Sequence, residues 1–129
     1  MAYGTLKADV VQSATAGTPP QFNDGNGTQT GTLCRAWVNF NGTAGTIRSS
    51  FNVTSLTKNA TGDYTITLTT AMSDANYSAV VSAGAQANST LTNTIATISV
   101  ASSSTARITV FNTSNTTIDR DGVQVGIFR

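Results

Sequence analysis

The chain has 129 residues, which is enough for one domain with a hydrophobic core and too few for two ordinary ones. Only 10% of the residues are charged, and the net charge is +1, so the sequence offers no basic patch for nucleic acid. Histidine is absent and every acidic residue is Asp, which excludes the Ser–His and Cys–His pairs of common nucleophilic enzymes. We therefore expect a protein that is not an enzyme and that needs no cofactor and no metal ion.

Uncharged polar residues dominate the composition. Thr, Ser and Asn together exceed a third of the chain, and they are interleaved with Val, Ile, Phe and Tyr. This mixture favours short strands and turns over helices, and the strong helix former Glu is absent. The sequence therefore predicts an all-β fold. So few charges also give little electrostatic repulsion between copies, which favours self-association.

The N-terminal quarter differs from the rest of the chain. One short strand is predicted where Leu6, Ala8 and Val10 alternate with their neighbours. A polar run that contains both prolines follows, and it can supply little hydrophobic core. We expect residues 1–32 to form an extended attachment arm and residues 33–129 to form the folded domain.

Strands and turns then alternate along the chain. The first two predicted strands are residues 33–40 and 46–54, with a turn between them at Asn41 and Gly42. Alternation within the second strand places four residues on one face, namely Ile47, Ser49, Phe51 and Val53.

A second turn is predicted at residues 59–62 and is followed by the clearest half-buried strand, residues 64–69. Four more strands are predicted beyond it, at residues 77–84, 94–100, 106–111 and 122–128. Seven short strands at this spacing predict an antiparallel β-sandwich or a jelly-roll-like domain.

Two candidate reactive sites have structural explanations. Cys34 shares a strand face with Ala36 and Val38, which predicts a buried and inert thiol. Asp119 and Asp121 are two residues apart and could present a carboxylate pair on one strand face. Entry into the last strand explains both as turn residues, and we adopt that interpretation.

Aromatic residues provide candidates for a contact between subunits. Trp37 lies on the strand face opposite Cys34, so both faces of the strand 33–40 carry large apolar groups, and both are expected to be covered. One face is expected to pack against a second sheet, and the other against a neighbouring subunit or the N-terminal arm. The remaining candidates for a subunit interface are Tyr77, Phe111 and Phe128.

Four segments carry a resemblance to a known group of proteins: RAWVNFNG (35–42), IRSSFNV (47–53), GDYTI (62–66) and AMSDANY (71–77). Together they resemble a domain of tail-fibre and related appendage proteins in the virions of tailed phages that infect aquatic bacteria. The opening MAYGTLK also resembles the start of such fibre-like proteins. The resemblance implies a virion structural protein that forms a small homotrimeric β-knob, either a short tail fibre or a capsid decoration or head fibre.

In this interpretation residues 1–32 anchor the knob to other virion proteins, with Leu6, Ala8 and Val10 adding a strand to a sheet edge. The sequence shows no signal peptide and no apolar run of membrane length, so we expect synthesis in the host cytoplasm, assembly on the virion and no membrane contact.

Host attachment is a further expectation. The loops around 57–62, 85–93 and 112–117 are rich in Asn, Ser and Thr, whose amide and hydroxyl groups suit hydrogen bonding to a host-surface glycan. An alternative function is a monomeric carbohydrate-binding module, which requires exposed aromatic residues that form a platform for stacking sugars.

Overall fold

The computed structural model describes residues 14, 21–23, 28–30, 34–85 and 93–129. The chain divides into two compact units, Met1–Leu33 and Cys34–Arg129. In the first unit, β1 (Gln21–Asn23) pairs with β2 (Thr28–Thr30) as a short antiparallel hairpin within the run predicted to be an extended arm. The strand predicted around Leu6, Ala8 and Val10 lies outside the described residues.

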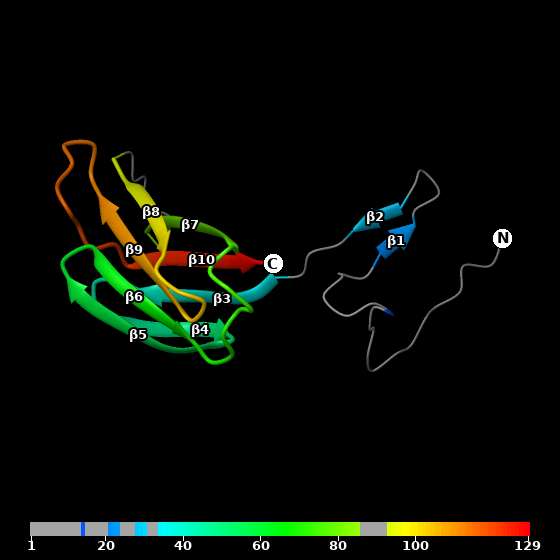
Figure 1. The fold of residues 1–129 in the computed structure, drawn as a ribbon. Coiled ribbons are helices and arrows are strands. Elements are labelled where there is room, and N and C mark those ends of the chain that lie inside the picture. The colour runs from blue at the N-terminus through cyan, green and yellow to red at the C-terminus, as the bar shows by residue number, and fades with distance from the viewer. Residues whose placement is uncertain (1–13, 15–20, 24–27, 31–33, 86–92) are drawn as a thin grey trace, which may run out of the picture. The chain divides into compact units, whose positions relative to one another are not determined.

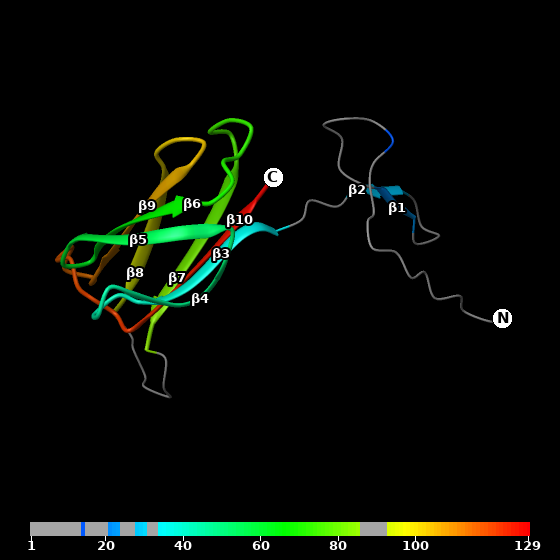
Figure 2. The ribbon, with the colours of Figure 1, turned by 90° about the horizontal axis from the view of Figure 1, so that it is seen from below.

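The second unit is a β-sandwich, which confirms the predicted fold class (Figure 1). One antiparallel sheet has the strand order β4-β3-β10-β7, and the other has the order β5-β6-β9-β8. The two sheets pack face to face as two layers, which are seen from another side in Figure 2. The strands are β3 (Cys34–Asn41), β4 (Thr46–Phe51), β5 (Val53–Ala60), β6 (Asp63–Leu68), β7 (Ser78–Gly84), β8 (Ile95–Val100), β9 (Thr105–Phe111) and β10 (Gly122–Phe128).

The core follows from alternation along the central strands. Every second side chain of β3, β6, β9 and β10 points between the sheets, as expected for strands that are buried on one face only. Near the β3–β4 and β5–β6 turns the buried rings of Phe40 and Tyr64 meet edge to face, with centroids 5.1 Å apart. The buried apolar side chains of these strands are Ala36, Val38, Phe40, Tyr64, Ile66, Leu68, Ala106, Ile108, Val110, Val123, Val125 and Ile127.

The predicted strand 46–54 is in fact two strands in different sheets. β4 ends at Phe51 and β5 begins at Val53, because Asn52 between them adopts a left-handed backbone conformation with φ of 56°. Phe51 is consequently exposed on one sheet while Val53 is buried in the core. The prediction that these two side chains share a face is therefore wrong.

The side chain of Asn52 holds this corner together. Its Nδ2 donates to the carbonyl oxygens of Arg35 (3.0 Å) and Thr70 (3.1 Å), and the amide of Thr70 donates to its Oδ1 at 2.7 Å. Asn tolerates the left-handed region better than most residues, so one side chain satisfies both the backbone conformation and the polar groups of the bend.

The sandwich has two distinct ends. Cys34 pairs with Phe128 at one end, where the C-terminal Arg129 also lies. At the other end the amide of Gly42 donates to the carbonyl of Arg120 at 2.9 Å, so the β3–β4 turn lies beside the segment that precedes β10. Within the described residues there is no helix, and so none that could cross a membrane.

Candidate functional site

A row of apolar residues crosses the outer face of the sheet β4-β3-β10-β7. Trp37 on β3 lies between two cross-strand partners, Phe51 on β4 and Gly126 on β10, and Gly126 pairs in turn with Val80 on β7. Phe51, Trp37 and Val80 keep 54%, 39% and 55% of their surface exposed. Three large apolar side chains in one row are unlike the scattered single apolar residues of an ordinary protein surface.

Phe128 makes this row continuous. A Cβ atom built on Gly126 would lie 3.3 Å from Cε2 of Phe128 and 3.4 Å from Cγ2 of Val80. The ring of Phe128 therefore occupies the outer face beside Gly126, where a larger residue would crowd it. We call the four side chains Phe51, Trp37, Phe128 and Val80 the outer strip.

A row of uncharged polar residues borders the outer strip. Gln124 on β10 pairs with Ser82 on β7 and with Asn39 on β3, and Asn39 pairs with Ser49 on β4. Within this row Ser82 Oγ lies 2.8 Å from Gln124 Oε1. The face thus combines an apolar strip with neutral hydrogen-bonding groups, which is the usual composition of a protein contact surface.

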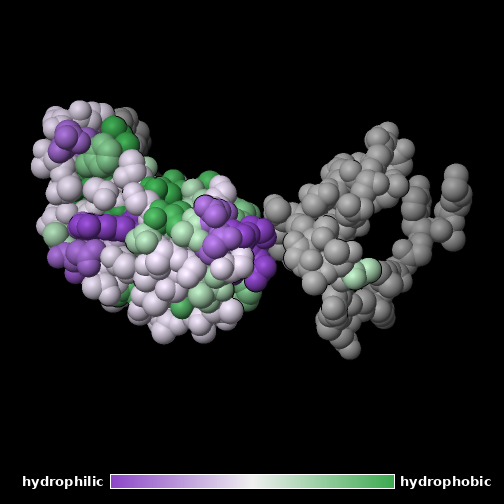
Figure 3. Space-filling view, in the orientation of Figure 1, coloured by the Kyte–Doolittle hydropathy of each residue, from purple (hydrophilic) through white to green (hydrophobic). Residues whose placement is uncertain are grey.

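The outer face of the other sheet is different. There Arg107 Nε donates to Asp63 Oδ1 at 2.8 Å, and the other guanidinium nitrogen pairs with the second carboxylate oxygen. Donation from Arg107 holds the pKa of Asp63 below its ordinary value. Asn59 Nδ2 donates to Asp63 Oδ1 at 3.2 Å and to Thr65 Oγ1 at 2.9 Å. In Figure 3 the face of the sandwich turned to the viewer is mostly pale, as expected for its Thr and Ser residues, with a few hydrophilic and hydrophobic patches.

The structure brings together two of the four residues predicted for a subunit interface. Trp37 and Phe128 both belong to the outer strip. Phe111 instead lies on the other sheet, where it pairs with Ile95, which is 42% exposed. Tyr77 is not on a surface at all: it is buried in the core, its hydroxyl lies 3.1 Å from the carbonyl oxygens of Ser102 and Thr105, and burial raises its pKa.

Phe51 and Val80 belong to the site and were not predicted for it. The sequence places Phe51 within an apparent single strand and gives no sign of the bend at Asn52. Val80 lies on an edge strand, β7, where adjacent valines leave the inward and outward positions ambiguous. Only the strand pairing shows that both residues are level with Trp37.

Cys34 corrects another prediction, because its residue is exposed. Alternation from Ala36 would place it in the core, but the pairing between β3 and β10 shifts at this point. Ile127 pairs with Ala36 and Phe128 pairs with Cys34, so Arg35 is an extra residue that interrupts the alternation. The thiol lies 3.3 Å from the Ala36 carbonyl oxygen.

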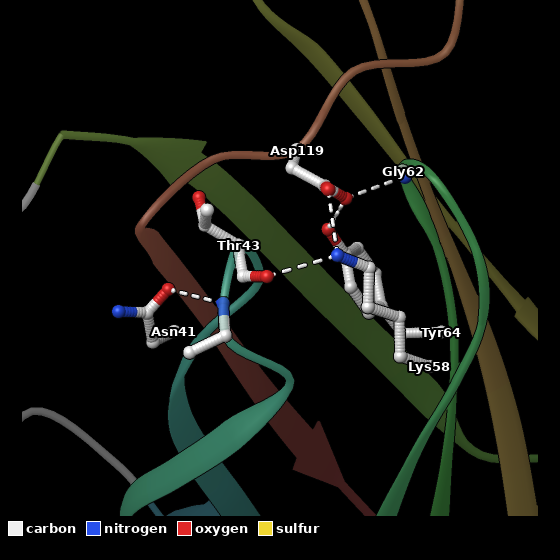
Figure 4. Close-up of polar contacts among 7 residues, drawn as sticks. Asn41, Thr43, Lys58, Gly62, Tyr64 and Asp119 are labelled. Atoms are coloured by element: carbon white, nitrogen blue, oxygen red, sulfur yellow. Dashed lines mark hydrogen bonds and ion pairs between the residues drawn. The ribbon is translucent and has the colours of Figure 1, made fainter.

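A polar cluster around Asp119 joins the segment before β10 to the β5–β6 hairpin (Figure 4). Asp119 Oδ1 accepts hydrogen bonds from the hydroxyl of Tyr64 at 2.6 Å and from the amide of Gly62 at 2.8 Å. Its Oδ2 pairs with Lys58 Nζ at 2.6 Å, and the same ammonium donates to the Thr43 carbonyl at 2.9 Å. The carboxylate therefore connects the segment before β10 to the β5–β6 hairpin, and Lys58 extends the cluster to the β3–β4 turn at Thr43.

The electrostatics of this cluster are those of a structural contact. Partial burial raises the pKa of Asp119, but donation from Lys58, Tyr64 and Gly62 outweighs burial and holds the pKa below its ordinary value. Burial and the neighbouring carboxylate raise the pKa of Tyr64 well above its ordinary range, so its hydroxyl stays protonated and donates. Asp119 and Asp121 both lie in the segment that precedes β10, outside any strand.

The loops considered for glycan contact are only partly described. The β5–β6 turn and the loop after β9 lie at the same end of the sandwich, since the amide of Ile118 donates to the Val110 carbonyl and the amide of Val110 donates to the Gly62 carbonyl. Most of the loop at 85–93 lies outside the described residues.

The outer strip has the composition of a contact surface. Aromatic and aliphatic side chains with a neutral polar border can pack against another apolar surface, and exposed rings can also stack on sugars. No group of three or more His, Cys, Asp or Glu side chains that could hold a metal ion occurs among the described residues. No family model matches the chain, and neither curated proteins nor solved structures include a match.

Proposed function

We propose that this chain is a structural protein of a tailed-phage virion, a short tail fibre or a capsid decoration, whose β-sandwich associates with copies of itself as a homotrimer. The observation that carries the proposal is the outer strip. Leaving Trp37, Phe51 and Val80 in water is unfavourable by about 25 cal/mol for each Å² of apolar surface. Assembly would remove this surface from water.

Two features of the sequence support the same proposal. Charged residues make up only 10% of the chain, so copies repel one another weakly. The segments between residues 35 and 77 resemble virion appendage proteins, and they include Trp37 and Phe51 of the outer strip.

The proposed architecture separates attachment from display. Residues 1–32 attach the knob to other virion proteins. The loops at the end of the sandwich opposite Cys34, including 112–117, then face away from the point at which the chain enters the sandwich and contact a host-surface glycan. A variant with these loop residues replaced by Gly and Ser should lose binding on a glycan array, and equal binding by both proteins would count against receptor contact at this end.

Solution mass and particle location test the proposal. At high protein concentration, light scattering should give a trimer for the full chain and for a version that lacks residues 1–32. Antibodies against residues 33–129 should label virions at the tail or capsid in electron micrographs. A monomer in both light-scattering experiments would remove the physical support for an appendage. Virions without label would refute the structural role directly.

A second function is favoured by the same exposed rings. Trp37 and Phe51 are cross-strand neighbours on an open sheet face, which is the arrangement expected of a sugar-stacking platform in a monomeric carbohydrate-binding module. The two functions differ in their response to sugar. A binding module would remain monomeric and change its Trp37 fluorescence on titration with oligosaccharides, whereas a subunit contact would be insensitive to them.

A further inference from the structure

We infer that the outer strip is the surface through which copies of this chain contact one another, so that in the trimer the sheet β4-β3-β10-β7 of each copy packs against the same sheet of its neighbours. This inference rests on the self-association proposed above, and it adds that the opposite sheet face makes no such contact and that Trp37 dominates the contact. Neither the sequence pattern nor the fold class by itself distinguishes the two faces.

The charge distribution allows a second copy to be the occupant. The four strands of this sheet contain two cations, Arg35 and Arg48, and no acidic residue. Both cations lie away from the centre of the face: Arg35 is at the start of β3, and Arg48 donates to the Phe40 carbonyl oxygen at 3.0 Å near the opposite end. The strip and its polar border are neutral, so two such faces can meet without bringing like charges together at the centre.

The opposite face is a poor candidate for the same contact. It carries the ion pair of Arg107 and Asp63, and the guanidinium of Arg107 is well exposed to solvent. Burying this pair against another copy would require the desolvation of charged groups. The apolar side chains of this face, Ile95 and Phe111, lie toward the edge at β8 rather than across the sheet. The comparison between the two faces therefore points to the sheet that carries Trp37.

Trp37 has the position of an interface hot spot. It lies on a central strand, with Phe51 beside it on one edge strand and with Phe128 and Val80 toward the other edge. Trp is enriched among the residues that dominate binding, and such residues cluster near the centre of an interface that has a polar rim.

The size of the face sets the strength of the contact. Four strands spaced by about 4.8 Å and about seven residues long give a flat footprint of roughly 15 by 23 Å, or about 350 Å². Each partner in a standard stable complex buries ~800 Å² of accessible surface, so this footprint is small for a stable complex. A contact centred on this face is therefore reversible and depends on protein concentration. A closed ring, in which each copy contacts two others, would strengthen it.

The experiment uses the full chain and its single tryptophan as the reporter. Sedimentation velocity and acrylamide quenching of Trp37 fluorescence are measured on the same samples over a thousandfold range of concentration. The test variant carries Phe51→Ser and Val80→Ser, which alter exposed side chains on the two edge strands. The matched control is Ile95→Ser, which alters an apolar side chain of comparable exposure on the other sheet. Circular dichroism establishes that each variant is folded.

We expect Trp37 to become protected from acrylamide over the same concentrations at which the chain assembles. The double variant should need about tenfold or more protein to assemble, while Ile95→Ser should assemble like the parent chain. The comparison of protection with assembly uses the unaltered chain, so it decides the question even if the double variant does not fold.

The other outcomes separate this inference from the proposed function. A trimer in which Trp37 stays as accessible as in dilute protein would overturn the inference and leave self-association intact, because another surface would then make the contact. A monomer at every concentration would overturn both. A monomer with Trp37 already protected would show that the chain itself covers the strip, and protection that appears only with added sugar would establish the binding-module alternative.

Discussion

Replacing Asp119 by Ala tests how much the polar cluster at the loop end of the sandwich contributes to stability. The substitution leaves the buried hydroxyl of Tyr64 without its acceptor, which costs about 1–3 kcal/mol, and it removes one acceptor from the amide of Gly62, which costs about 1 kcal/mol. The ion pair with Lys58 is partly exposed and adds about 0–1 kcal/mol. We therefore expect the free energy of unfolding to fall by about 3 kcal/mol.

Two further variants separate the parts of this effect. Asp119→Asn keeps a neutral acceptor for Tyr64 and Gly62 and should cost about 1 kcal/mol, because the hydrogen bonds lose their charge. Tyr64→Phe removes the donor while it preserves the ring that packs against Phe40, so Asp119→Ala should cost about 1–2 kcal/mol less in that background.

Urea denaturation of the full chain, followed by circular dichroism in the far ultraviolet, measures these free energies. Lys58→Ala serves as the control for the ion pair and should cost less than 1 kcal/mol. A loss below about 0.5 kcal/mol for Asp119→Ala, or a loss that is unchanged by Tyr64→Phe, would refute the reasoning, because the carboxylate would then not be the acceptor that the hydroxyl requires.

Three other perturbations have defined outcomes. Asn52→Gly keeps easy access to the left-handed conformation but loses the side-chain hydrogen bonds at the corner, so it should lower the free energy of unfolding by about 1 kcal/mol. Asn52→Ala also disfavours the left-handed conformation and should lower it by about 2 kcal/mol, measured by urea denaturation. Gly62→Ala should destabilise the fold by about 3 kcal/mol or more in thermal unfolding, because φ of Gly62 is +68° and a Cβ would lie 2.4 Å from the Val110 carbonyl oxygen. The control is Gly84→Ala, which adds a methyl group to open space and should be within about 0.5 kcal/mol of the parent chain. The pKa values of Asp63 and Asp119 in the folded protein lie below the ordinary value of 3.8. The stabilisation from these two carboxylates is therefore complete above pH 3.8 and is lost as the pH falls through their pKa values in the folded protein. Asp119→Asn should consequently reduce the loss of stability in acid, measured as the free energy of unfolding against pH.

Each of these outcomes can fail in a recognisable way. Equal stability of the two Asn52 variants would mean that backbone strain at the corner is negligible. A fully stable Gly62→Ala protein would show that the β5–β6 turn can move away from β9. An acid limb that is unchanged by Asp119→Asn would assign the pH dependence to other carboxylates.

Strand positions were largely predictable from the sequence, because sheets that bury one face produce alternation that short windows detect. The strand at Gly122–Phe128 agrees with its prediction residue for residue, and the other six predicted strands in the sandwich overlap observed ones. The strand Val53–Ala60 was not predicted as a separate strand. Its start depends on a bend at Asn52, and a single Asn in a polar, Thr-rich segment gives no distinctive local signal.

The candidate site was less predictable than the fold. Trp37 and Phe128 could be selected because they are aromatic and lie on predicted strands. Their proximity on one face depends on the pairing of β3 with β10, which joins residues far apart in the sequence. Tyr77, of the same residue class, is buried because its hydroxyl finds backbone acceptors inside the domain.

The sequence by itself determined the all-β class, the sandwich of short strands and the scarcity of charge, because these depend on composition and on alternation between neighbouring residues. Only the tertiary structure decided which strands pair, and with them the outer strip, the exposure of Cys34 and the cluster around Asp119. Each of these depends on strand register, on an extra residue in a strand or on a single left-handed residue. A shift of one residue turns a side chain from one face of a sheet to the other, and the local sequence does not encode that shift.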